Sequence, residues 1–218
     1  MPKRALIESR PWLLGSLVAG ISFWLFHAAP VPGVLVIGWK GAGVACLAGY
    51  AASRLGGRDR TLLALAMALG ALGDMLIEID LALGALAFFF GHMAAIALYA
   101  RHPRAVPTPS QRMFGLALLV LTPLIAFSLP FDRGSAWRVG LYALALGGMA
   151  AAAWLSRFNR YRVGFGALLF VISDLLIFAR MGPLADSAIP EMLIWPFYYF
   201  GQFLICTGVV AELRPDPE

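Results

Sequence analysis

Long apolar stretches separated by short polar connections dominate this chain. Eight stretches are about 20 residues long, which is the length of α-helix needed to cross the hydrocarbon core of a bilayer. The connections carry helix-breaking and basic residues, as in PVPG, RLGGRDR and RHPRAVPTPS. The pattern predicts eight membrane-spanning helices at about residues 11–29, 33–53, 61–79, 81–100, 112–130, 136–156, 161–181 and 191–212.

The predicted fold class is therefore all-α, a polytopic membrane protein in which residues 1–218 form a single domain. No connection is long enough to separate two domains. The connection near Asp80 is so short that the third and fourth helices must form an antiparallel hairpin. The N-terminal segment resembles a signal peptide, but its apolar part is about 18 residues, which is long for such a signal, so we expect a first spanning helix.

Composition and charge support this class of protein. The chain is 61% hydrophobic and 13% charged, whereas soluble domains average about 25% charged residues. Of the 17 Lys and Arg, 13 fall on one side of the predicted membrane and three on the other. This split predicts that both termini are cytoplasmic. It also explains the net charge of +5 without nucleic acid as a partner. The Arg-rich, Lys-poor composition fits a bacterial inner membrane.

Two halves of the chain share a short motif. LGDMLI at 72–77 resembles ISDLLI at 172–177, and a helix with an aromatic-Gly-polar step follows each, FFFGHM at 88–93 and YYFGQF at 198–203. The offset is four helices, so both copies would have the same orientation. We therefore predict a 4+4 parallel internal repeat about an axis along the membrane normal.

Several polar residues lie inside the apolar segments. An ionised side chain in the middle of a spanning helix costs about 2.5–3.5 kcal/mol, so such residues normally pair in the interior or serve a function. Asp74 and Asp174 occupy corresponding places in the two motifs, while Glu78 lies near enough to a helix end to reach interfacial water. The full set is His27, Lys40, Asp74, Glu78, His92, Tyr142, Asp174, Tyr198, Tyr199 and Gln202.

One interpretation is that these residues only hold helices together, with Asp74 bonded to Lys40 or His92, and Asp174 bonded to Tyr198 or Gln202. Polar pairs in membranes contribute about 0.6–2 kcal/mol, which hardly offsets the insertion cost. We therefore expect a functional pair of aspartates. Lys40 could be a counter-ion or contact a substrate. Tyr142 could be a packing residue or contact a substrate.

Other chemistries find little support in the sequence. A catalytic zinc needs at least two well-placed imidazoles, but only His92 lies deep in a segment, and His102 is in a basic loop. Cys46 and Cys206 are in apolar stretches without a CxxC motif. Ser173 has no base nearby in sequence. Without a GxSxG, P-loop or GxGxxG motif, we expect no metal and no cofactor.

In their order along the chain, these residues resemble the lysoplasmalogenase (YhhN-like) family of eight-helix membrane proteins. The resemblance covers roughly residues 15–212. Its markers are Lys40, Gly73-Asp74, Gly91-His92, Tyr142 with Met149, FVISD at 170–174 and YYFGQ at 198–202. The resemblance implies hydrolysis of the vinyl ether bond of a lysoplasmalogen, which gives a fatty aldehyde and glycerophosphocholine or glycerophosphoethanolamine. The expected partners are thus this lysophospholipid and the bilayer.

This reaction needs an acid to protonate a carbon, a negative charge near the resulting cation, and a base for water. Two carboxyl groups in different environments can supply these functions. Our hypothesis is that Asp74 and Asp174 face one central cavity, one as acid and the other as stabiliser or base, with His92 as proton relay. The residues expected to contact substrate or orient water are Lys40, Tyr142, Tyr198, Gln202 and Glu78.

Two other functions remain open. Intramembrane Asp, His and Lys residues with a parallel repeat are also typical of proton-coupled transporters. Proline within the segments occurs mainly at Pro123 and Pro196. Neither is near an aspartate, which disfavours an ion site on a broken helix. The third possibility is a lipid-binding subunit that performs no chemistry.

Overall fold

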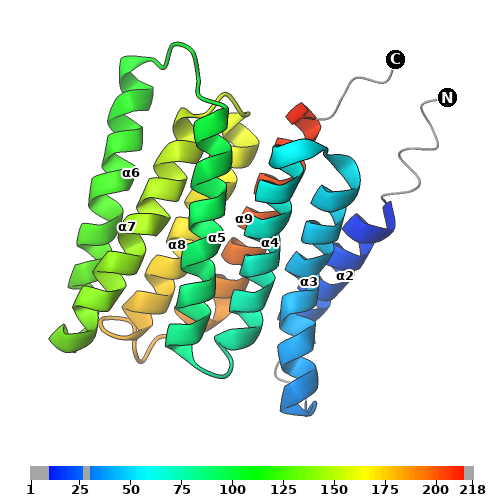
Figure 1. Cartoon of the computed structure of the whole chain (residues 1–218). Coiled ribbons are helices and arrows are strands. Elements are labelled where there is room, and N and C mark those ends of the chain that lie inside the picture. Colours follow the sequence, from blue (N-terminus) through cyan, green and yellow to red (C-terminus); the bar gives the residue numbers. More distant parts are fainter. Residues whose placement is uncertain (1–9, 27–29, 214–218) are drawn as a thin grey trace. The chain divides into compact units, whose positions relative to one another are not determined.

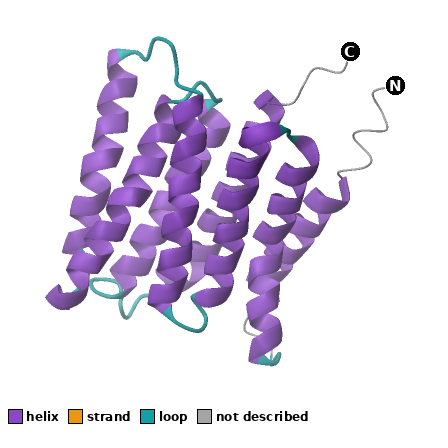
Figure 2. Ribbon diagram, in the orientation of Figure 1, coloured by secondary structure: helices purple, strands orange, loops and turns teal. Residues whose placement is uncertain are grey.

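A computed structural model of the chain describes residues 10–26 and 30–213. These residues form long helices joined by short loops (Figures 1 and 2). His27, one of the polar residues in the predicted apolar segments, lies outside the described residues. The all-α prediction is confirmed.

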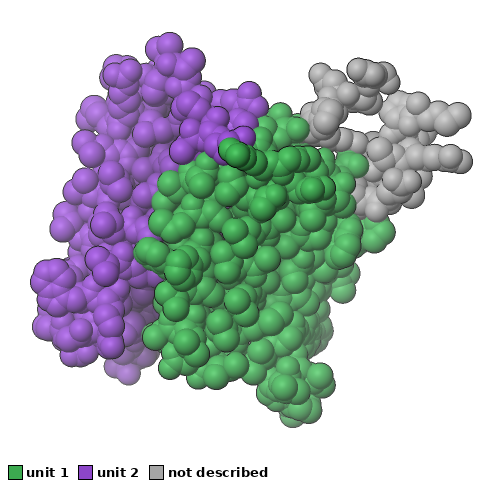
Figure 3. Space-filling model, in the orientation of Figure 1, with its two compact units in different colours: residues 1–98, 209–218 green, residues 99–208 purple. Residues whose placement is uncertain are grey.

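The chain divides into two compact units, which Figure 3 colours separately. Of the described residues, those up to Leu98 and those from Val209 onward form the first unit. In this unit α3 packs against both α2 and α4. Its helices are α2 (Arg10–Phe26), α3 (Gly33–Arg54), α4 (Gly57–Leu76) and α5 (Leu81–Arg101) up to Leu98.

Residues 99–208 form the second unit. Here α7 packs against α6 and α8, and a short π-helix, η1, leads into α8. Its helices are α6 (Pro109–Ser128), α7 (Arg133–Leu155), η1 (Arg160–Gly164), α8 (Phe165–Arg180) and α9 (Ile189–Leu213) up to Gly208. Within the described residues, each unit thus contains most of four long helices. The repeat and the single-domain assignment stay predictions.

The helix boundaries fall within a few residues of those expected from sequence. The largest difference is at α4, which begins at Gly57 and ends at Leu76, because residues 77–79 form a turn. The predicted hairpin near Asp80 is confirmed. Its side chain closes the turn, since Asp80 Oδ1 accepts a hydrogen bond of 2.9 Å from the backbone N–H of Leu83 in the first turn of α5.

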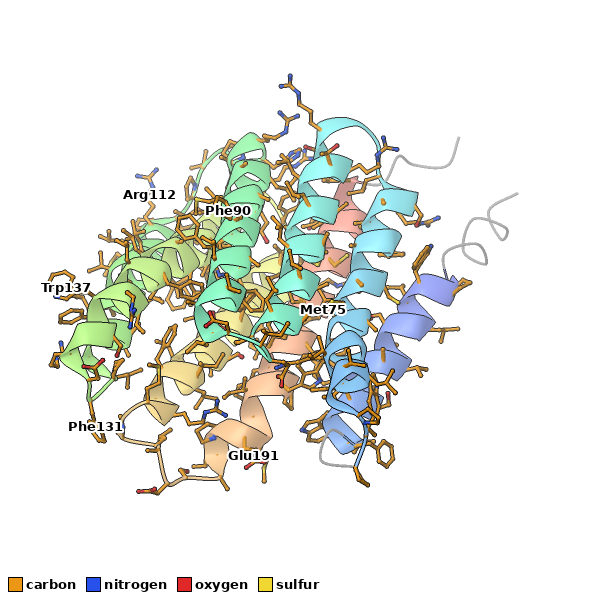
Figure 4. All side chains as sticks on the ribbon, turned by 60° about the horizontal axis from the view of Figure 1, so that its bottom comes forward. Met75, Phe90, Arg112, Phe131, Trp137 and Glu191 are labelled. Carbon is orange, nitrogen blue, oxygen red and sulfur yellow. The ribbon has the colours of Figure 1, made fainter. Side chains whose placement is uncertain are left out.

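Six helices within the described residues are long and apolar enough to cross a membrane. Of the other two, α2 is apolar but shorter, and α4 carries charges in its first turn and at Asp74. Large apolar side chains also stay exposed: Phe90 on α5 is 52% exposed and Trp137 on α7 is 73% exposed (Figure 4). Such surfaces are typical of helices that face lipid. The structure thus indicates a multi-pass membrane protein.

Glycine allows helix backbones to approach closely where α8 meets α9. A Cβ atom added to Gly166 would lie 2.7 Å from the carbonyl oxygen of Gly201, and one added to Gly201 would lie 2.7 Å from that of Gly166. Lipid chains are as apolar as the helices, so helices in membranes associate through such close packing rather than through a hydrophobic driving force. This contact fixes the part of α8 that precedes Asp174.

We predict that Gly166→Ala lowers the thermal unfolding midpoint in detergent, because the new methyl group must displace the backbone of α9. The expected cost is roughly 1–3 kcal/mol. The matched control is Gly38→Ala in α3, where an added Cβ meets nothing within 4 Å. This control should be neutral or stabilising by up to about 1 kcal/mol. Equal destabilisation by both substitutions would contradict the proposed packing role.

Candidate functional site

Asp74 and His92 lie on the neighbouring helices α4 and α5 and are buried, with 2% and 3% of their surfaces exposed. Each follows a glycine at the contact between these helices. A Cβ atom on Gly73 would lie 2.8 Å from the Phe88 ring, and one on Gly91 would lie 3.4 Å from the carbonyl oxygen of Ala66. The small residues therefore let α4 and α5 pack closely beside both polar side chains.

Lys40 on α3 forms an ion pair with Glu78, which lies in the turn after α4. Lys40 Nζ donates to Glu78 Oε1 at 2.5 Å, and the side chains are 18% and 37% exposed. The close approach of α3 and α4 makes this possible, because Gly41 leaves room for Met75 (Figure 4) and the backbone of Ala71. The interpretation that paired Lys40 with Asp74 is wrong, because the counter-ion of Lys40 is Glu78.

Asp174 on α8 is 5% exposed and accepts a hydrogen bond of 2.6 Å from the hydroxyl of Tyr142 on α7. One turn before it, Phe170 makes an edge-to-face contact with Tyr198 on α9, with 5.1 Å between ring centres. One turn after it, Phe178 makes a similar contact with Tyr142 at 5.9 Å. Aromatic contacts to two helices therefore flank the carboxyl group along one face of α8.

Tyr198 and Gln202 share a buried face of α9, as their spacing predicts. Gln202 Nε2 donates to the hydroxyl of Tyr198 across 3.5 Å, and both residues are 4% exposed. Ser173 is also buried, but its hydroxyl donates to the carbonyl oxygen of Ile194 at 2.9 Å. This bond ties α8 to α9 and gives Ser173 a structural role.

The partner of Asp174 was not predicted from the sequence. The sequence suggests Tyr198 or Gln202 as its partner, whereas the structure shows a hydrogen bond from Tyr142. The two residues are 32 positions apart on different helices, and neither belongs to a local motif with the other. The only sequence signal was that both were polar residues in apolar segments. The shared cavity for Asp74 and Asp174, which lie in different compact units, stays a prediction.

No group of three His, Cys, Asp or Glu residues that could hold a metal ion occurs in the part of the chain that the structure describes. Cys46 and Cys206 are free thiols.

The helices and their buried polar side chains define a multi-pass helical membrane protein with carboxyl groups inside it. The family model of the YhhN family matches residues 35–209, so the chain belongs to the YhhN family. This confirms the family predicted from the residue pattern. Searches of curated proteins and of solved structures give no match to the chain.

We predict that Lys40→Met and Glu78→Gln each lower the stability of the folded protein in detergent. The expected loss is about 0.5–1 kcal/mol, because the pair is partly exposed and water weakens its attraction. The exchanged pair, Lys40→Glu with Glu78→Lys, should recover part of the loss.

The control is Arg58→Gln on the exposed first turn of α4, which should change the unfolding midpoint little. The exchanged double variant could instead lose more stability than the sum of the losses in the two single variants. In that case the ion pair would not be the interaction that holds these side chains together.

Proposed function

We propose that this protein is a membrane-embedded hydrolase that cleaves the vinyl ether bond of lysoplasmalogens. The products would be a fatty aldehyde and glycerophosphocholine or glycerophosphoethanolamine. The observation that carries the proposal is that a chain of the YhhN family buries two carboxyl groups, Asp74 and Asp174, on its helices. Burying such groups is costly, so their presence favours a chemical role.

The reaction explains why two carboxyl groups would be kept. A proton is first added to the vinyl carbon that does not carry oxygen, which leaves a cation shared between the other carbon and the ether oxygen. Water then adds to that carbon and loses a proton to a base. The hemiacetal formed collapses to the aldehyde, and the glycerol oxygen leaves as a hydroxyl group. The reaction thus needs an acid to donate the first proton, a negative charge to stabilise the cation and a base to accept the proton from water.

The contacts of Asp174 suggest how the roles divide. A hydroxyl group that donates to a carboxylate oxygen supports negative charge on it, and Tyr142 donates to Asp174 Oδ2. We therefore assign Asp174 as the stabiliser of the cation and Asp74 as the acid, with His92 as the relay for the proton of water. This requires that both aspartates reach one substrate molecule.

The remaining polar residues would position the substrate. Tyr198 and Gln202 are joined by a hydrogen bond and would orient the vinyl ether or the water. The partly exposed pair of Lys40 and Glu78 would contact the headgroup, with the ammonium group of Lys40 near its phosphate.

The finer topology is also part of this proposal. If α2 and α4 cross the bilayer as well as the six longer apolar helices, the chain spans the membrane eight times. The distribution of basic residues then places both termini in the cytoplasm. We propose the bacterial inner membrane as its location and a 4+4 parallel repeat as its architecture.

We predict that the purified protein in detergent releases aldehyde from lysoplasmenylethanolamine, and that Asp74→Asn and Asp174→Asn each lower kcat by about 10²–10⁴-fold. This is the range by which acid–base groups accelerate reactions. The control is Asp186→Asn in the exposed loop before α9, which should keep full activity.

Near-normal turnover by both folded variants would contradict the carboxyl mechanism. If the folded wild type released no aldehyde from either headgroup form, the substrate would be a different lipid, or the protein would be a transporter. Proton flux measured in vesicles would then identify the transporter.

We also predict that Tyr142→Phe lowers kcat by roughly 10- to 150-fold and leaves KM nearly unchanged, because a single hydrogen bond to a charged group contributes about 1.5–3 kcal/mol. The matched control is Tyr99→Phe, since the Tyr99 hydroxyl is buried and has no hydrogen-bond partner among the described residues. A rise in KM without a change in kcat would show that Tyr142 binds substrate rather than positioning Asp174.

A further inference from the structure

Two loops of the second unit are joined into one rigid surface, which we call the basic platform (residues 99–112 and 155–164). The backbone N–H of Arg157 donates to the carbonyl oxygen of His102 at 2.8 Å. The backbone N–H of Arg104 donates to the carbonyl oxygen of Leu155 at 3.1 Å. The Arg104 guanidinium also donates to the carbonyl oxygen of Phe158 at 3.1 Å. Backbone and side-chain bonds together therefore hold the platform in shape.

The basic platform contains six arginines and one histidine and no Asp or Glu. The arginines are Arg101, Arg104, Arg112, Arg157, Arg160 and Arg162. The segments at the opposite ends of the same helices, 131–138 and 180–191, contain three arginines and three carboxylates. The net positive charge of this unit is thus concentrated at one end, whereas arginines and carboxylates are equal in number at the other.

The platform lies where four apolar helices begin or end, so it is at the surface of the membrane that they cross. The helix boundaries there are Arg101 at the end of α5, Pro109 at the start of α6, Leu155 at the end of α7 and Arg160 at the start of η1.

Aromatic side chains accompany the charges. The Arg160 guanidinium is 5.8 Å from the centre of the Trp154 ring and 6.0 Å from that of Tyr161. Tyr161 is 83% exposed, and Phe165, one turn further, is 46% exposed. Aromatic and basic residues together are typical of the depth at which lipid headgroups lie.

We propose that the basic platform binds the phosphates of anionic phospholipid headgroups, such as those of phosphatidylglycerol. A guanidinium group can hold a phosphate through two parallel hydrogen bonds. The lipid is favoured over nucleic acid because the arginines adjoin exposed rings that belong at the bilayer surface. This site is separate from the proposed hydrolase site and does not depend on lysoplasmalogen cleavage.

The test compares the wild type with two double variants that each remove two charges. Arg157→Gln with Arg162→Gln alters exposed arginines of the platform. Arg138→Gln with Arg180→Gln alters exposed arginines at the opposite end of the unit. Native mass spectrometry in detergent measures the binding of phosphatidylglycerol and of phosphatidylcholine, and thermal unfolding measures stabilisation by each lipid. If the double variant of the platform does not fold, the single variant Arg112→Gln is measured in its place.

The expected result is that phosphatidylglycerol binds and stabilises the wild type more than phosphatidylcholine, and that salt weakens this difference. The platform pair should lose roughly 10- to 30-fold in affinity, because each arginine near an anionic surface contributes about a factor of five. The control pair should keep the wild-type affinity.

Equal binding of the two lipids by the wild type would overturn the proposal. So would an equal loss in both double variants, because net charge alone would then explain binding. A third contrary result is equal stabilisation by soluble glycerol 3-phosphate, which would identify a site for free anions instead of lipids.

Discussion

The cost of placing ionisable side chains in apolar helices governs this structure. Lys40, Asp74, His92 and Asp174 all lie on helices whose surroundings are otherwise apolar. Each must be compensated locally, since lipid offers no hydrogen bonds. The structure shows two ways of doing this. Lys40 forms an ion pair with Glu78, and Asp174 accepts a hydrogen bond from the hydroxyl of Tyr142.

These pairings depend on how closely the helices approach. Gly41 brings α3 against α4, which places Lys40 within reach of Glu78. Gly166 and Gly201 bring α8 against α9, on the turns that lead to Asp174 and Gln202. Small residues thus do more than join helices, because they set the positions of the polar groups that our proposed chemistry uses. A larger side chain at such a position would change both the packing and the site.

The proposed hydrolase and the basic platform use charge in opposite ways. The hydrolase needs isolated carboxyl groups away from water, where each charge acts strongly on a nearby cation. The platform gathers arginines at the membrane surface, where water and salt weaken each charge and only a cluster attracts a partner. Both follow from a chain in which the few charged residues are segregated by depth.

The sequence by itself determined the all-helical class, the approximate helix boundaries, the hairpin at Asp80 and the family. These depend on local properties: apolar run length, helix breakers and the order of a few motif residues. Only the tertiary structure decided that Lys40 pairs with Glu78 instead of Asp74, and that Asp174 pairs with Tyr142 instead of Tyr198 or Gln202. Such choices depend on which helices are neighbours and how each is rotated. Packing across distant parts of the chain sets both, and no local pattern records it.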